Sequence, residues 1–76
     1  MNRMPSRDGA AIRRERLQMI VEFVRREPGT RIERIQVFMA MRTGLTAARV
    51  SKYVRELVSG ELLAEVDGRF EVVKKR

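Results

Sequence analysis

Basic side chains recur at helical spacing in the segment that follows Thr46. Lys52 and Arg55 lie three positions apart, so both project from one face if this segment is a helix. An ammonium and a guanidinium placed in this way can bind phosphate oxygens, and the guanidinium fork also matches the O6 and N7 acceptors of guanine. The whole chain is basic, with 17 Lys and Arg against 10 Asp and Glu and a formal charge of +7. A polyanionic partner is the prediction, and a solvated basic surface is the alternative that charge leaves open.

Catalytic and metal-binding chemistry finds little support in the residue types. The chain has no His and no Cys, so it lacks the commonest general base and the two commonest zinc ligands. Asp8 and Asp67 fall in segments that read as an arm and a turn. We therefore expect a protein that is not an enzyme and that uses no cofactor and no metal, and no small-molecule ligand is evident from the sequence.

Length and hydropathy predict one intracellular domain. The 76 residues suffice for a single domain at residues 10–73, with a flexible basic arm at residues 1–9 and a basic tail at residues 74–76. The longest apolar run, Val37 to Met41, is far shorter than the roughly 20 residues of a membrane span. The arm has no apolar core of a secretory signal. A cytoplasmic, nucleoid-associated protein is expected.

A first helix is predicted from Ala10 to Glu27, where apolar residues recur with a period near 3.6. Pro28 and Gly29 end it, because proline restricts the residue before it and glycine supplies a turn. The expected buried stripe is Leu17, Ile20, Val21 and Val24. A second apolar edge of Ile12, Met19 and Phe23 predicts either a dimer contact or burial in the core by the hairpin.

A second helix is predicted from Arg31 to about Arg42. Thr30 and Glu33 have the spacing of a capping box, in which each side chain accepts from the other residue's backbone amide. Gly44 is expected to end the helix in the left-handed conformation. The expected apolar set is Ile32, Ile35, Phe38 and Met39, with Val37 and Met41 at its flanks.

A third helix is predicted to begin at Thr46, a good N-cap residue. Leu45 before the cap and Val50 after it have the spacing of a hydrophobic staple, and Gly60 is expected to end the helix. The buried stripe is predicted to be Val50, Tyr53, Val54 and Leu57. Ala48, Ser51, Lys52 and Arg55 then point away from the core.

A β-hairpin is predicted at the end of the domain. Leu62 to Val66 and Arg69 to Val73 flank Asp67-Gly68, a pair that favours the two-residue type I′ turn. This register places Leu63, Phe70 and Val72 on one face, which can cover the helices. The predicted fold class is α+β, mainly α, with three helices followed by a C-terminal two-stranded hairpin.

The spacing of three small or apolar residues resembles a known motif. Ala40, Gly44 four residues later and Val50 six residues beyond that resemble the helix-turn-helix signature of bacterial and archaeal regulators. In this reading Ala40 lets the two helices approach closely. The resemblance is close over residues 31–57, and the layout of residues 10–73 resembles a winged helix-turn-helix domain.

This resemblance implies a set of DNA-contacting residues. On the recognition helix they are Thr46, Ala47, Ala48, Arg49, Ser51, Lys52 and Arg55, and on the wing Arg69. Tyr53 departs from the signature, which has an aliphatic residue there. Either its ring is buried with the hydroxyl at the rim, or the hydroxyl donates to a phosphate.

The function that these features imply is binding of double-stranded DNA through a major-groove helix. We expect a sequence-specific transcriptional regulator that acts as a homodimer on symmetric half-sites. The alternative is a winged-helix module for protein contacts, or an architectural module, within a replication, partition or transcription complex.

Overall fold

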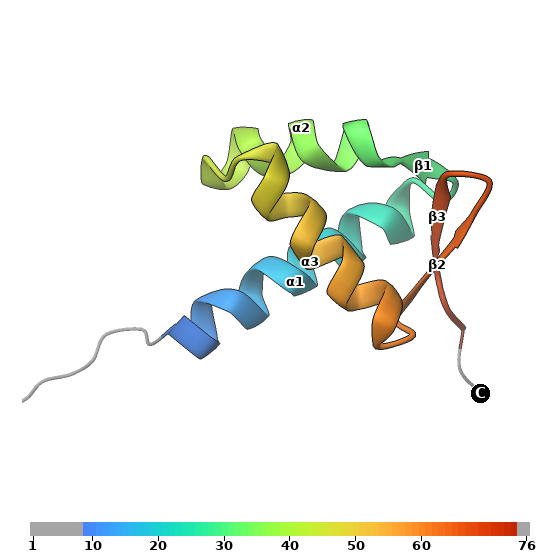
Figure 1. Ribbon diagram of the computed structural model, residues 1–76, viewed down its shortest axis with the longest axis horizontal. Coiled ribbons are helices and arrows are strands. Elements are labelled where there is room, and N and C mark those ends of the chain that lie inside the picture. The colour runs from blue at the N-terminus through green and yellow to red at the C-terminus, as the bar shows by residue number, and fades with distance from the viewer. Residues whose placement is uncertain (1–8, 75–76) are drawn as a thin grey trace, which may run out of the picture.

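The computed structural model describes residues 9–74, so the predicted arm and tail lie outside the described residues except for Gly9 and Lys74. The elements in chain order are α1 (Gly9–Arg26), β1 (Thr30–Arg31), α2 (Ile32–Thr43), α3 (Ala47–Ser59), β2 (Leu63–Val66) and β3 (Arg69–Val72). Figure 1 shows the helices packed together, with the strands at the end of the bundle where α1 ends and α2 begins. The predicted α+β, mainly α, fold class is confirmed.

The buried stripe of helix α1 is displaced from the predicted one. Ile20 and Val24 are buried as expected, but Phe23, which was assigned to a second edge, is also buried. Its ring stacks on Phe38 of α2, with centroids 4.4 Å apart. Val21, in contrast, is only half-buried. The stripe is displaced because α2 covers the Phe23 side of the helix, a contact that the periodicity of α1 alone does not contain.

The predicted capping box at the start of α2 is wrong. Thr30 lies in strand β1, opposite Phe70, and α2 begins at Ile32 with Arg31 as an N-cap that makes no side-chain bond. The Thr30 hydroxyl is buried and has no hydrogen-bond partner within the described part of the chain. Strand pairing therefore prevails over the local cap. The other end of α2 follows the prediction, because Gly44 is left-handed with φ of 78° and donates to Ala40 O.

Helix α3 begins as predicted and ends differently. The Thr46 hydroxyl accepts from the Arg49 amide at 3.2 Å, which confirms the N-cap. At the other end Gly60 has φ of −83°, and the left-handed residue is Glu61 with φ of 64°. The chain therefore turns one residue later than predicted, at a residue for which this conformation is strained.

The strands form a three-stranded antiparallel sheet in the order β1-β3-β2, where two strands were predicted. The hairpin itself has the predicted register, with Leu63 opposite Val72 and Glu65 opposite Phe70. Asp67 and Gly68 both have positive φ, as a type I′ turn requires. The added strand β1 pairs with the outer edge of β3, and the Gly29 amide donates to Phe70 O at 2.9 Å.

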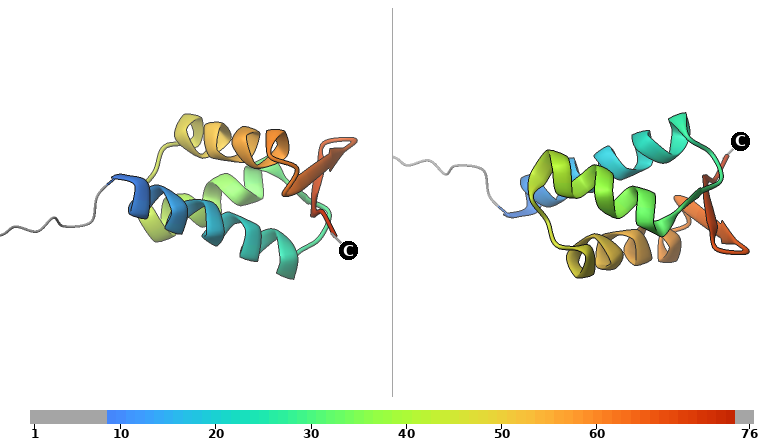
Figure 2. Two further views of the ribbon diagram at one scale, coloured as in Figure 1. Left: turned by 90° about the horizontal axis from the view of Figure 1, so that it is seen from below. Right: turned by 90° about the horizontal axis from the view of Figure 1, so that it is seen from above.

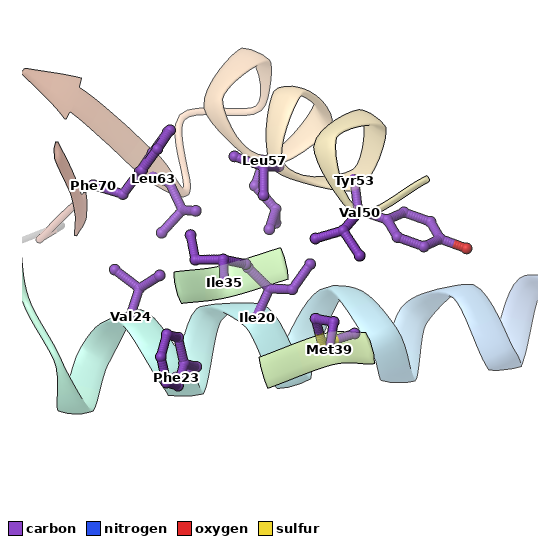
Figure 3. Packing of buried hydrophobic residues seen from close by; sticks show 11 residues of the cluster. Ile20, Phe23, Val24, Ile35, Met39, Val50, Tyr53, Leu57, Leu63 and Phe70 are labelled. Atoms are coloured by element: carbon purple, nitrogen blue, oxygen red, sulfur yellow. The ribbon is translucent and has the colours of Figure 1, made fainter. Parts of the chain in front are cut away.

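One hydrophobic core joins the helices to the sheet. Its buried side chains are Ile20, Phe23, Val24, Ile35, Met39, Val50, Tyr53, Val54, Leu57, Leu63 and Phe70. Figure 3 shows Leu63 and Phe70 closing one end of this cluster, while the Tyr53 hydroxyl points away from the other labelled side chains. Of the two alternatives for Tyr53, the structure favours a buried ring with its hydroxyl at the rim.

Candidate nucleic-acid interface

The outward face of α3 is exposed and predominantly basic. Its buried stripe is complete, since Val50, Tyr53, Val54 and Leu57 all belong to the core. The opposite side presents Thr46, Ala47, Ala48, Arg49, Lys52 and Arg55, all of which are exposed. Ala47 and Ala48 have small side chains, so a partner can approach the backbone of the first turn of α3 closely. Figure 2 shows α3 lying along one side of the bundle, with the sheet at its C-terminal end.

Ser51 lies at the edge of this face. It is half-buried, and its hydroxyl accepts a hydrogen bond from Gln36 Nε2 at 3.0 Å. This bond joins α2 to α3. Ser51 therefore has a structural partner, whereas Lys52 beside it makes no ion pair with the described part of the chain.

Ala40 does not have the packing role assigned to it. It is exposed, whereas its neighbour Met39 is completely buried. The contact between α2 and α3 rests on Met39, Ile35 and the Gln36–Ser51 hydrogen bond. Gly44 and Val50 hold the positions expected of them, in the turn and in the core.

The one acidic residue of α3 is paired with a cation from α1. Glu56 accepts a hydrogen bond from Arg13 Nη2, and both side chains are about half exposed. The pair reduces the negative charge that a phosphate would meet on this helix. The cations Arg49, Lys52 and Arg55 make no ion pair within residues 9–74.

The three-stranded sheet of β1, β2 and β3, called the wing from here on, contains a second basic residue that the sequence did not indicate. Arg31 of β1 and Arg69 of β3 are directly opposite in the antiparallel register, so their side chains leave the same face of the sheet. Arg69 Nη1 donates to Gly29 O at 3.1 Å. A Cβ atom at Gly68 would lie 3.3 Å from Arg31 Nη1, which places that guanidinium against the hairpin turn.

The interpretation of Arg31 as the first residue of a helix concealed this position. Only the pairing of β1 with β3 brings it beside Arg69, 38 positions further along the chain. The sequence contains only a weak indication of this strand: Thr30 and Arg31 follow the turn at Pro28-Gly29 and are extended in the structure. Two residues are too few for a strand pattern to be recognised.

A hollow of about 300 Å³ separates α3 from the wing. Ser51, Arg55 and Val58 line it from α3, and Glu65 and Phe70 line it from the sheet. Glu65 is exposed and shares a sheet face with Phe70, so it lines the same hollow as Arg55. The two form no ion pair within residues 9–74, and each is available to a ligand.

Within residues 9–74, none of the helices combines the length and apolar character that crossing a bilayer requires. In comparisons with protein-family models, curated proteins and solved structures, no match to this chain was found.

Proposed function

We propose that this protein binds double-stranded DNA, with α3 in the major groove. The observation that carries the proposal is the division of α3 into a fully buried apolar stripe and an outward face on which Arg49, Lys52 and Arg55 are exposed. A helix whose apolar side is fixed in the core and whose basic side makes no ion pair within residues 9–74 fits the width of a major groove. Lys52 and Arg55 are the residues that we expect to reach base edges.

The remaining contacts of the proposed interface are to the DNA backbone. The N-terminus of α3 favours a phosphate, because free amides and the helix dipole are attractive to anions. The Arg31 and Arg69 pair supports a second phosphate contact from the wing, since like charges placed directly opposite are unfavourable until an anion lies between them. Base contacts give specificity and these backbone contacts give register.

The biological role that we infer is sequence-specific transcriptional regulation by a homodimer. The protein then works in the cytoplasm, associated with the nucleoid. A domain of this size contributes few base contacts, and two copies on half-sites one helical turn apart double them. The arrangement requires no cofactor.

The test measures binding of the full chain to a fluorescent library of genomic fragments and to random duplexes, each at two salt concentrations. Enrichment of particular fragments by about a thousandfold over random DNA supports a regulator. Equal affinity for all duplexes would contradict sequence-specific regulation and would favour the architectural alternative. If no duplex binds even at low salt, the proposal that this protein binds DNA is wrong.

A pair of matched variants locates the interface. Arg55→Ala should weaken specific binding, whereas Arg25→Ala, at an exposed arginine of α1, should leave it unchanged. Both remove one guanidinium and lower the net charge equally. If the two variants weaken binding to the same extent, the effect is one of overall charge, and the assignment of α3 is wrong.

A further inference from the structure

An apolar patch is exposed on α2, apart from the basic surfaces described above. Val37 is 58% exposed and Met41 is 80% exposed, and the two lie one turn apart on the same side of the helix. Beside them is a shallow hollow of about 350 Å³, which Phe23, Val37 and Phe38 line together with Glu33 and Arg34. Apolar groups that remain exposed around a hollow are typical of a contact surface.

The charges beside the patch indicate what occupies it. With about 3.6 residues per turn, Val37 and Met41 project between the directions of Glu33 and Arg34. A twofold axis parallel to α2 exchanges these two sides of the patch. It therefore brings Glu33 of each chain to Arg34 of the other, on both flanks of the apolar contact. The patch is complementary to a second copy of itself.

The two charged residues can form these intermolecular pairs at little cost. Among residues 9–74, Glu33 has no ion pair, and Arg34 has one exposed pair to Glu27 with an Nη2–Oε1 distance of 3.3 Å. An exposed pair of this kind contributes little, so replacing it costs little. The outward face of α3 cannot pair with its own copy in the same way, since Arg49, Lys52 and Arg55 would face like charges.

We propose that the chain self-associates through α2, in a parallel homodimer centred on Val37 and Met41. This names a surface for the homodimer of the proposed function, and it differs from the α1 edge that the sequence suggested. Phe23 of that edge is instead buried beneath Phe38. The patch and the α3 face share no residue, so this contact uses none of the residues proposed to bind DNA.

Sedimentation velocity of the full chain without DNA tests the surface. The wild-type chain should reach twice the 8.9 kDa of one copy as its concentration rises from micromolar to millimolar. The variant Val37→Gln with Met41→Gln should remain at 8.9 kDa with an unchanged circular dichroism spectrum. The control Leu62→Gln removes a 49% exposed apolar side chain elsewhere and should dimerise like the wild type. A monomeric wild type, or a dimer lost only in Leu62→Gln, overturns the proposal.

Charge exchange tests the parallel pairing. Glu33→Arg and Arg34→Glu should each raise the dissociation constant of the dimer about tenfold, because each places like charges against each other twice. The double variant exchanges the two charges and should restore the wild-type constant to within about threefold. A double variant as weak as the single ones contradicts the pairing. Since no DNA is present, failure of DNA binding and failure of this surface are separate results.

Discussion

Arg31 and Arg69 occupy directly opposite positions on β1 and β3, so two guanidinium groups leave the same face of the wing side by side. Opposed like charges destabilise an antiparallel pair. The Arg69 side chain is held by the Gly29 carbonyl, and Arg31 lies against the Gly68 turn. The pair is therefore costly for the fold and favourable for an anion.

The first prediction is that Arg31→Gln acts on stability and on DNA binding in opposite directions. Removing one of the opposed charges should raise the free energy of unfolding by about 0.5 kcal/mol. DNA affinity should fall equally for all sequences, and the slope of log affinity against log salt should decrease by about 0.9. Denaturant titration and anisotropy at several salt concentrations measure the two effects. A loss of sequence preference would instead indicate that Arg31 contacts a base.

The second prediction concerns Arg55. Arg55→Gln should cost about 1 to 3 kcal/mol on the preferred duplex and relax the preference at one base position, because a bidentate contact to guanine is lost. Selection from a randomised duplex pool reads out this position. Uniform weakening without altered preference would make Arg55 a phosphate contact.

The third prediction is that Glu65→Gln strengthens DNA binding. This residue lines the hollow between α3 and the wing, where Arg55 is also found. Neutralising it removes repulsion of the phosphates and leaves the Arg55 guanidinium unopposed, which should raise affinity about threefold at low salt. Glu22→Gln, at an exposed glutamate of α1 away from both basic surfaces, is the control with the same change in charge. Equal gains in both variants would assign the effect to net charge.

The fourth prediction distinguishes two roles for Thr30, a buried strand residue and a helix N-cap. Its hydroxyl is buried without a partner among residues 9–74, so Thr30→Val should raise the free energy of unfolding by about 1 kcal/mol. A capping box would give the opposite sign, a loss of about 1 kcal/mol. Urea unfolding of the two chains distinguishes the outcomes, since the side chains have nearly the same shape.

The fifth prediction concerns the turn after α3. Glu61 has φ of 64° and is exposed, so it bears the strain of a left-handed residue without a compensating buried contact. Glu61→Gly should stabilise the fold by about 0.5 to 1 kcal/mol, and the melting temperature should rise by about 4 °C. Gly60→Ala is the comparison. Gly60 has φ of −83°, which any residue can adopt, so this position does not require glycine. A lower melting temperature for Glu61→Gly would contradict this account of the turn.

The sequence by itself determined the features that depend on neighbouring residues. Thr46 caps α3 through an amide three residues away, and Gly44 ends α2 through a carbonyl four residues away. The Asp67-Gly68 turn sets the register of β2 and β3, since a two-residue turn allows only one pairing. The exposure of Arg49, Lys52 and Arg55 follows from the apolar period of α3.

The tertiary structure alone decided the features that join distant segments. Thr30 and Arg31 form a strand because β3, about 40 residues later, offers an unpaired edge, and this pairing prevails over the local capping signal. Phe23 is buried because Phe38 stacks on it, and Val37 and Met41 are exposed because no element within residues 9–74 covers their side of α2. Periodicity reports which side of a helix is apolar, whereas the elements packed around it decide which apolar side chains are buried.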